Sequence, residues 1–346
     1  MTYLREAPTL RNRGRAVYTD LARARYRAMR VIFMGSPEFA VPTLRALAAA
    51  HDVALVVSQP DKPAGRGAQV MAPAVKIAAA ELGLPVIQPR SARTGELERA
   101  LRESGAELAV VVAYGKILPP AVLGALPRGC VNVHASLLPK YRGAAPVQWA
   151  VIDAEPATGV AIMQLDEGMD TGPVFRMRET AIDADETAGE LLARLAPIGA
   201  AELLAVIGEL ASGAARATPQ ASTGASHARM LTKADGAIDF AQPARLVASR
   251  IRGVDPWPGA QAMLRGQIVK LFRARENERG GGEAGAVIEI DAAGVHVACG
   301  GGAVAIREIQ SPGRKRMAAA QFAAGRGIAV GDRFEPLPPP AAEPAT

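Results

Sequence analysis

Short apolar runs alternate with longer Ala- and Leu-rich segments through the first half of the chain. Runs that are apolar at nearly every position are typical of strands buried on both faces of a sheet, whereas the longer segments indicate helices. The predicted strands are Val31–Met34, Val53–Ser58, Pro85–Gln88, Leu108–Ala113 and Cys130–His134, and the predicted helices are Val41–Ala50, Pro73–Leu82, Gly95–Ser104 and Pro119–Leu126. This alternation predicts an α/β fold with a doubly wound, Rossmann-like sheet, whose site lies beyond the carboxyl ends of the strands.

The alternation of apolar runs and helix-length segments becomes less regular after Ala145, and the last third of the chain has short alternating runs instead. One helix, strands at Gly159–Leu165 and Gly172–Glu179, and a long helix from about Thr187 to Leu210 are predicted there. Beyond them, short alternating runs separated by Gly-rich turns predict a small OB-like β-barrel. These runs are Ala260–Leu264, Gln267–Ala274, Ala286–Ile290, Gly294–Ala298 and Ala303–Ile309.

The predicted domains follow from these changes of pattern. The α/β domain takes residues 29–212, a linker rich in Ala, Ser, Thr, Gly and Gln takes 213–226, and the barrel takes 227–335. The Pro-rich tail at 336–346 is predicted to be disordered. Residues 1–28 are Arg-rich without apolar periodicity, so an RNA-binding arm, an organelle transit peptide and an extension upstream of a true start at Met29 all stay open; we favour the extension.

Composition and charge narrow the class of protein. With 346 residues, 49% of them hydrophobic and 21% charged, the chain is predicted to be globular rather than disordered or fibrous. The net charge of +6 is uneven: residues 30–226 carry 17 basic and 20 acidic side chains, and residues 227–335 carry 16 and 11. We found no uninterrupted apolar run of membrane-spanning length and no signal core, so we expect a cytoplasmic protein that binds no membrane.

Two cysteines, Cys130 and Cys299, exclude a disulfide framework, and their surroundings lack further ligands at metal-site spacing, so we expect no metal.

Candidate chemistry begins at Asn132 and His134, which lie two residues apart at the carboxyl end of a predicted strand. Their side chains therefore point to the same face and can converge on one substrate atom. An amide beside an imidazole can polarise a carbonyl and move a proton. A lone histidine on a strand is more often structural, so the pair needs a third group to support a catalytic interpretation.

Asp170 is the candidate third group. It lies in a Gly-bracketed acidic loop, Asp166–Gly172, between two predicted strands. A carboxylate near His134 would orient the imidazole and fix its tautomer. By itself, the loop would be an ordinary solvated turn. A nicotinamide cofactor is disfavoured because the first βα turn, after Met34, lacks the G-x-G-x-x-G pattern.

Asn132-x-His134, followed by Ser136–Pro139 and later by Asp166–Gly172, resembles the folate-dependent formyltransferases. Further motifs resemble the members of this family that formylate methionyl-tRNA, and the resemblance covers about residues 29–335. These motifs are Phe33–Pro42, Gln59–Gly67, Tyr141–Pro146, Asp255–Pro258 and Ile309–Met317.

The resemblance implies that a formyl group passes from 10-formyltetrahydrofolate to the free amino group of methionyl initiator tRNA. The amine would attack the formyl carbon directly, with Asn132 and His134 stabilising the developing oxyanion. Asp170 would hold His134 and assist proton transfer. The folate would be bordered by a backbone-rich loop and by the loop between Ala113 and Leu118. The implied folate-binding residues are Tyr114, Gly115, Ser136, Leu137, Leu138 and Pro139.

The resemblance also implies a tRNA partner and, we expect, a monomer. The loop from Gln59 to Val70 would reach the tRNA acceptor end, chiefly through Arg66, and the basic barrel would follow the phosphates. The implied tRNA-binding residues are Lys62, Arg66, Arg252, Lys270, Arg314, Lys315 and Arg316. Two other functions stay open: formylation of a small acceptor, such as an amino sugar or glycinamide ribonucleotide, and tRNA binding without catalysis. The Gln59–Gly67 loop and the basic barrel argue against a small acceptor, and the three catalytic candidates argue against binding alone.

Overall fold

The computed structural model describes residues 28–64 and 69–338, and the chain divides into two compact units. The first unit comprises the residues up to Pro139 together with Val160–Arg178 and Leu195–Ala225, and the second comprises Lys140–Gly159, Glu179–Arg194 and the residues from Ser226 onward. The units are therefore interleaved along the sequence, which a pattern of local periodicity cannot reveal. The predictions for residues 1–27 and 339–346 lie outside the described residues, and the predicted domain limits stay a prediction.

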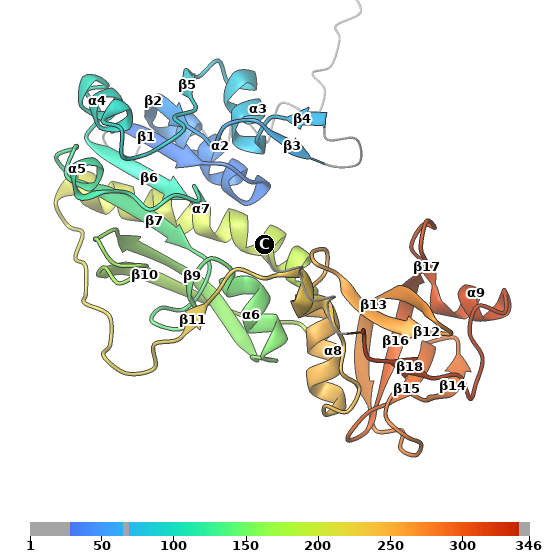
Figure 1. Ribbon diagram of the computed structural model, residues 1–346. Helices are drawn as coiled ribbons and strands as arrows, with labels where there is room; N and C mark the ends of the chain where they lie inside the picture. Colours follow the sequence, from blue (N-terminus) through green and yellow to red (C-terminus); the bar gives the residue numbers. More distant parts are fainter. Residues whose placement is uncertain (1–27, 65–68, 339–346) are drawn as a thin grey trace, which may run out of the picture. The chain divides into compact units, whose positions relative to one another are not determined.

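A mixed seven-stranded sheet organises the first half of the chain (Figure 1). Its order is β10-β9-β7-β6-β1-β2-β5. From β1 the chain proceeds outward to β2 and β5 on one side, then returns to pair β6 with β1 and continues to β7, all in parallel. This is the doubly wound α/β arrangement that the sequence predicts, and β9 adds an antiparallel neighbour to β7. The strands are β1 (Arg30–Gly35), β2 (Asp52–Val57), β5 (Val86–Ile87), β6 (Leu108–Val112), β7 (Cys130–His134), β9 (Ala157–Gln164) and β10 (Val174–Ala181).

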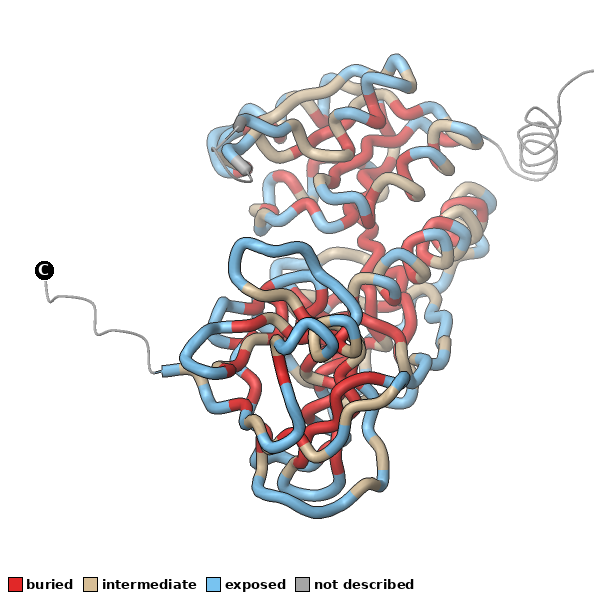
Figure 2. The backbone as a smooth tube through the Cα atoms, turned by 90° about the vertical axis from the view of Figure 1, so that its right-hand side faces the viewer, coloured by how far each residue is buried: buried red, intermediate tan, exposed pale blue. Residues whose placement is uncertain are grey.

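Helices cover both faces of this sheet. On one face, Leu97 and Leu101 of α4 and Val122 of α5 share an apolar cluster with strand residues such as Ile32 and Cys130. The face bearing Val133 is covered by α7. The helices are α2 (Val41–Ala50), α3 (Ala74–Glu81), α4 (Glu96–Glu103), α5 (Pro120–Leu123) and α7 (Ala188–Ser212), with a short 3-10 helix, η2 (Glu38–Ala40), before α2. Figure 2 shows the backbone coloured by burial, with buried residues toward the inside and exposed residues mostly in the outer loops.

Gly199 brings α7 close to the sheet. A Cβ at this position would lie 2.7 Å from Cγ1 of Val133 and 3.4 Å from Cγ1 of Val160, so only glycine permits this approach. Since neighbouring residues on a strand point to opposite faces, Val133 faces α7 while Asn132 and His134 face the side of Cys130 and α5. Within the described residues, α7 is long and apolar enough to cross a membrane by length and composition, and half of its apolar window is buried inside the protein. The expectation that the chain binds no membrane stays a prediction.

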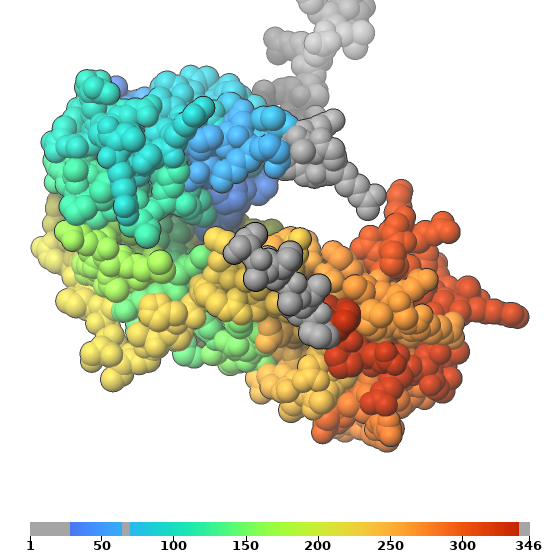
Figure 3. Space-filling view, in the orientation of Figure 1, coloured from blue at the N-terminus to red at the C-terminus, as the bar shows by residue number. Residues whose placement is uncertain are grey.

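The second unit contains a closed antiparallel barrel of order β14-β15-β16-β13-β12-β18. Ala286, just before β14, bridges Arg333, just before β18, and Phe334 N donates to the carbonyl oxygen of Gly285 at 2.8 Å, so the last strand meets the first. The turn between β16 and β17 projects from the barrel (Figures 1 and 3). The elements are β12 (Ala260–Leu264), β13 (Gln267–Asn277), β14 (Val287–Asp291), β15 (Gly294–Ala298), β16 (Ala303–Gln310), β17 (Met317–Ala318), α9 (Ala319–Ala324) and β18 (Phe334–Glu335).

A helix that the sequence analysis did not identify, α8 (Ala244–Gly253), packs on this barrel. Its apolar residues Ala244, Val247, Ala248 and Ile251 follow helical spacing and join the barrel core, whereas arginines between them obscure the pattern. The same unit contains α6 (Pro146–Ile152), η3 (Lys233–Gly236) and a two-stranded pairing of β8 (Arg142–Gly143) with β11 (His227–Ala228). A hairpin of β3 (Lys62–Ala64) and β4 (Gln69–Met71) belongs to the first unit.

Candidate active site

Asn132 and His134 project from β7 near its carboxyl end. Asn132 pairs in register with Val111 of β6 and Met163 of β9, so the strand is fixed from both sides. The two side chains lie on the same face and are nearly buried, with 9% of Asn132 and 5% of His134 exposed. The structure thus gives the convergence that the spacing predicts, in a site of low solvent access where hydrogen bonds act more strongly than in water.

Asp170 comes to His134 from the loop between β9 and β10. Its Oδ2 lies 3.6 Å from His134 Nδ1, a contact slightly longer than a direct hydrogen bond. Asp170 adopts a left-handed backbone conformation with φ of 54°, and aspartate tolerates this region better than most residues. The three residues that the sequence predicts for catalysis therefore lie together within the first unit.

Asp166, in the same loop, has a structural role. Asp166 Oδ1 accepts hydrogen bonds from Gly168 N at 3.1 Å and from Thr171 Oγ1 at 2.7 Å. These contacts close the loop on itself, as aspartates often do in turns. Asp166 consequently shapes the loop while Asp170 faces the histidine, a distinction that the sequence could not make.

Gln220 holds the carbonyl groups on both sides of this turn. Its Nε2 donates to the carbonyl oxygen of Asp170 at 2.7 Å and to that of Gly172 at 2.8 Å. Nearby, Thr218 and Val174 exchange two backbone hydrogen bonds. The stretch predicted as a linker therefore supports the acidic loop. Sequence reasoning missed Gln220 because a glutamine among small polar residues carries no local pattern.

The two predicted folate loops offer mainly backbone. Ser136 is fully buried, and Leu138 packs in an apolar cluster with Met163 and Val174, while Leu137 and Pro139 are half-buried. Whether these residues border folate stays a prediction. The half-buried pair and the backbone between them are the groups of this loop that a flat heterocycle could contact.

In the second predicted folate loop, the buried side chain of Tyr114 attaches the loop to the core. Its ring is 1% exposed within the core that includes Met34, and burial raises the pKa of its hydroxyl to about 12. Gly115, with φ of 78°, and Ala113, with φ of 47°, are exposed on either side. The loop therefore presents its backbone, and the phenol ring stays in the core.

A polar network connects the carboxyl ends of four strands beside this loop. Gln59 Nε2 donates to the carbonyl oxygen of Tyr114 at 2.9 Å, and Gln59 N donates to Ser36 Oγ at 3.1 Å. Gln88 Nε2 donates both to the Gln59 carbonyl and to Asp61 Oδ1, each at 2.7 Å. Gln88 and an ion pair at 2.7 Å from Lys76 hold the pKa of Asp61 below its usual value. This network fixes the base of the β3–β4 hairpin.

The residues predicted to bind tRNA differ in their surroundings. Arg66 lies outside the described residues, whereas Lys62, Arg314 and Lys315 are exposed. Arg316 is also exposed but has partners within the chain: it pairs with Glu308, lies 3.2 Å from Asp255 Oδ2 and stacks 4.0 Å above the Phe272 ring.

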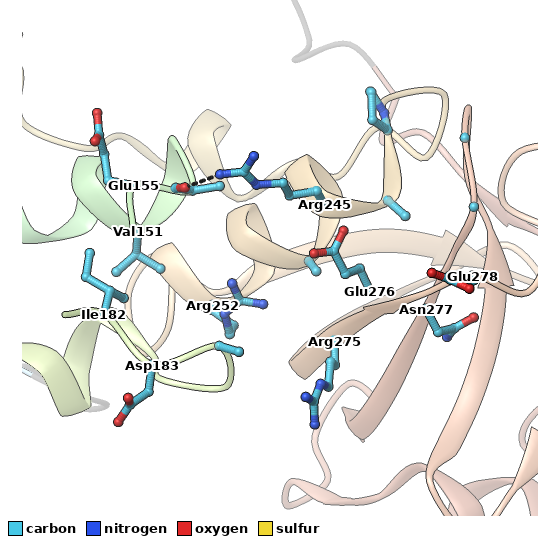
Figure 4. A pocket seen from close by; sticks show the side chains of 17 residues that line it. Val151, Glu155, Ile182, Asp183, Arg245, Arg252, Arg275, Glu276, Asn277 and Glu278 are labelled. Carbon is cyan, nitrogen blue, oxygen red and sulfur yellow. Dashed lines mark hydrogen bonds between the residues drawn. The ribbon is translucent and has the colours of Figure 1, made fainter. Parts of the chain in front are cut away.

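Arg252 and Lys270 are half-buried. Arg252 Nη1 donates to the carbonyl oxygen of Ala274 at 2.9 Å, and Lys270 Nζ donates to that of Pro258 at 3.4 Å. Arg252 lines a cavity of about 740 Å³ in the second unit (Figure 4). Burial there lowers the pKa of its guanidinium. The cavity also carries Arg245 and Arg275 together with acidic side chains, so its charge is mixed. The cavity-lining acidic residues are Glu155, Asp183, Glu276 and Glu278.

Metal-binding and thiol groups contribute little to the site. In residues 28–64 and 69–338, no three His, Cys, Asp or Glu side chains gather in an arrangement that could hold a metal ion. Burial raises the pKa of the thiols of Cys130 and Cys299 to about 12. Both are therefore protonated at neutral pH and are poor nucleophiles.

Comparison with known proteins gives a consistent result over most of the chain. The family described as "Formyl transferase" matches residues 29–207, and "Formyl transferase, C-terminal domain" matches residues 230–327. A methionyl-tRNA formyltransferase of Sorangium cellulosum is 46% identical over 306 residues, which is 88% of this chain and 98% of the relative. Another, of Geotalea daltonii, is 45% identical over 307 residues, or 88% of this chain and 98% of the relative.

A solved structure shares the fold. The N-formyltransferase from Helicobacter canadensis, in complex with folinic acid and dTDP-3-aminofucose, superposes with a TM-score of 0.62 at 16% identity. The similarity covers 82% of this chain and 99% of that one. At this identity the likeness concerns the arrangement of the backbone.

Proposed function

Since this chain belongs to the formyl transferase family, we propose that it transfers the formyl group of 10-formyltetrahydrofolate to the amino group of methionyl initiator tRNA. The product would serve translation initiation. The observation that carries the proposal is the approach of Asp170 to His134 at 3.6 Å, beside Asn132 on the same strand. An amide, an imidazole and a carboxylate are the groups that formyl transfer to an amine requires.

The proposed reaction needs no covalent enzyme intermediate. The amine nitrogen attacks the formyl carbon, and a new C–N bond forms while the carbonyl oxygen gains negative charge. The Asn132 amide and the His134 imidazole donate hydrogen bonds to that oxygen. The intermediate then collapses with cleavage of the bond to N10, and the proton lost by the amine is delivered to N10. Asp170 orients His134 and carries this proton.

Folate binding is assigned to backbone-rich loops. We place the folate co-substrate against Ser136, Leu137, Leu138 and Pro139, and beside Tyr114 and Gly115. The exposed backbone at Gly115 and the half-buried Leu137 and Pro139 favour this assignment, because a pterin needs apolar walls and a few backbone hydrogen bonds. The residues described offer no metal site, and the proposed chemistry requires none.

Binding of tRNA is assigned to two regions. Lys62 of β3 and Arg66, which follows β3 in the sequence, would contact the acceptor end, and the network of Gln59, Gln88 and Asp61 supports a fixed base for the β3–β4 hairpin. The barrel, which we infer to be OB-like, would follow the phosphate backbone through exposed cations such as Arg314 and Lys315. We further propose a cytoplasmic monomer.

The test is a direct comparison of acceptors. The protein is incubated with 10-formyltetrahydrofolate and, separately, charged initiator methionine tRNA, charged elongator methionine tRNA, an amino sugar nucleotide and glycinamide ribonucleotide. N-formylmethionine on the initiator tRNA alone is the expected result. Formylation of a small acceptor at a higher rate would contradict the proposal, and tRNA binding without any formylation would leave only a binding function.

A further inference from the structure

The two tryptophans of this chain have contrasting surroundings, although both lie in the second unit. Trp149 is half-buried: its Nε1 donates to the carbonyl oxygen of Arg229 at 2.8 Å, and the Arg229 guanidinium lies 4.9 Å above its ring. Trp257 is 53% exposed. Within the described part of the chain, no aromatic ring or cation is found stacked on Trp257. A large apolar ring left open to solvent indicates a binding surface.

The turn that carries Trp257 is firmly held. The carbonyl oxygen of Asp255 accepts from Gly189 N at 3.1 Å, and Gly259 N donates to the carbonyl oxygen of Val254 at 2.8 Å. The Asp255 carboxylate is nearly buried and pairs with Arg316 at 3.2 Å. The turn is therefore fixed by backbone hydrogen bonds before and after Trp257 and by an ion pair on its amino side.

Glycines on two neighbouring segments allow this turn to pack closely. A Cβ on Gly189 would lie 2.9 Å from Cδ of Pro256, and a Cβ on Gly236 would lie 2.5 Å from the carbonyl oxygen of Gly259. Larger residues at these positions would displace the turn. The Trp257 ring consequently projects from a rigid base and loses little conformational freedom when it binds a partner.

One cationic group, the ammonium of Lys270, lies beside this turn. Lys270 Nζ donates to the carbonyl oxygen of Pro258, the residue after Trp257, at 3.4 Å and is half exposed. Only one of its three donors is used in this contact. A planar apolar ring with an adjacent ammonium group matches a nucleotide, because the base can stack on the ring while the phosphate meets the cation.

We propose that Trp257 is a stacking platform for an unpaired nucleobase of bound tRNA, with Lys270 beside the adjoining phosphate. Asp255 and Arg316 are positioning residues for the platform. The scarcity of aromatic residues in the sequence argues against extensive base stacking. The inference is therefore limited to one exposed ring, Trp257, stacking on one base. This inference rests on the proposed function, because it takes tRNA as the partner.

The first test uses fluorescence of the full chain. In a Trp149→Phe variant, Trp257 is the sole tryptophan, and a Trp257→Phe variant reports Trp149 instead. We expect saturable quenching of Trp257 when uncharged tRNA is added, and a much smaller change in the Trp257→Phe variant. A blunt RNA duplex without unpaired bases should bind through charge without quenching Trp257. Equal quenching by duplex and tRNA, or no quenching at saturation, would overturn the inference.

The second test measures tRNA affinity. Trp257→Ala should raise the Kd for tRNA roughly tenfold, as expected for loss of one stacked base, while Trp257→Phe should retain most of the affinity. Val330→Ala, which shortens another exposed apolar side chain of the second unit, is the control and should leave the Kd unchanged. An unchanged Kd in Trp257→Ala would overturn the inference.

The inference and the proposed function fail in different ways. If the Trp257→Ala variant binds and formylates initiator tRNA like the parent protein, the platform is wrong and the proposed function stands. If tRNA quenches Trp257 in the Trp149→Phe variant but the parent protein formylates no tRNA, the proposed function is wrong and the platform stands. Circular dichroism of each variant checks that it is folded, and the Trp149→Phe measurement does not require that Trp257 be replaced.

Discussion

The side-chain amide of Gln220 donates to the carbonyl oxygen of Asp170 at 2.7 Å, across a separation of 50 residues in the sequence. The same nitrogen also donates to the carbonyl oxygen of Gly172, so one side chain fixes the turn on both sides. The position of the carboxylate near His134 thus depends on a segment that follows the long helix α7. A catalytic role for Asp170 makes Gln220 a positioning residue.

Replacing Gln220 by Ala should lower kcat for formyl transfer by about tenfold. This corresponds to about 1.4 kcal/mol, the size expected when the hydrogen bonds that hold a catalytic loop are removed. The KM for tRNA should change little. Steady-state kinetics with Thr223→Ala, an exposed position in the same segment, provide the control. If both variants are equally active, Gln220 has no positioning role.

Asn132→Ala and His134→Ala should each reduce turnover by about 10² to 10³, because each removes a donor from the developing oxyanion. Single-turnover rates and tRNA affinity are measured separately for both variants. The affinity should be nearly unchanged, since neither side chain is assigned to tRNA. Near-normal rates in both variants would exclude them from the mechanism.

Asp170→Asn should preserve the fold and reduce kcat by about 10²-fold, because an amide can neither carry the proton nor balance a protonated His134. Asp166→Asn is the matched control from the same loop. An asparagine oxygen can still accept the hydrogen bonds from Gly168 and Thr171, so this variant should stay close to parent activity. Similar losses in the two variants would indicate that the loop is only structural.

Local periodicity was sufficient to predict most of the first sheet and the barrel strands. The bounds of β7, β12 and β15 agree with the prediction, because each is a short apolar or alternating run between turn residues. Helix α8 was not identified, since its apolar positions are separated by arginines. The sequence predicts a loop at the β3–β4 hairpin, because Pro63 and neighbouring polar residues give it no strand pattern.

The placement of Asn132 and His134 on one face is predictable, because it follows from their spacing on a strand. That of Gln220 is not, because its importance arises from contacts between distant segments. Tyr114 shows a similar limit: the resemblance implies that its loop borders folate, but the burial of its ring in the core arises from packing that the sequence pattern does not show. The family membership expected from the motifs is confirmed, while the role of each site residue stays a prediction.

The basic residues of the turn after β16 should differ in function: Arg314 and Lys315 should bind phosphates, whereas Arg316 should mainly stabilise the fold. Neutralising Arg314 and Lys315 together by glutamine should weaken the binding of all tRNAs by similar factors. The slope of log Kd against log salt should decrease by about one for each cation that no longer meets a phosphate. Binding titrations of initiator and elongator tRNAs at several salt concentrations measure this. Weaker binding confined to initiator tRNA would contradict the assignment to the phosphate backbone.

Arg316→Gln should mainly reduce stability. It leaves the nearly buried Asp255 without its cation, and burial already raises the pKa of that carboxyl while Arg316 opposes the effect. We expect the free energy of unfolding to fall by about 1–3 kcal/mol, measured by denaturant titration. Unchanged stability with a lower salt slope would show instead that Arg316 contacts phosphate.

Both thiols should resist alkylation in the folded protein. Because burial raises the pKa of Cys130 and Cys299 to about 12, little thiolate exists at pH 8.5, and labelling should be roughly 10³-fold slower than for a free cysteine. Iodoacetamide labelling followed by mass spectrometry, with and without denaturant, measures this. Rapid labelling of Cys130 in the native protein would contradict the inferred burial.

The barrel closes through its final segment, where Arg333 bridges Ala286 and Phe334 pairs with Leu264 of β12. Proteolysis or truncation before Gly331 would therefore expose unpaired N–H and C=O groups along two strand edges at once. Such edges are templates for pairing with other chains, so the shortened protein should aggregate. The last strand, only two residues long, protects the whole barrel from intermolecular sheet formation.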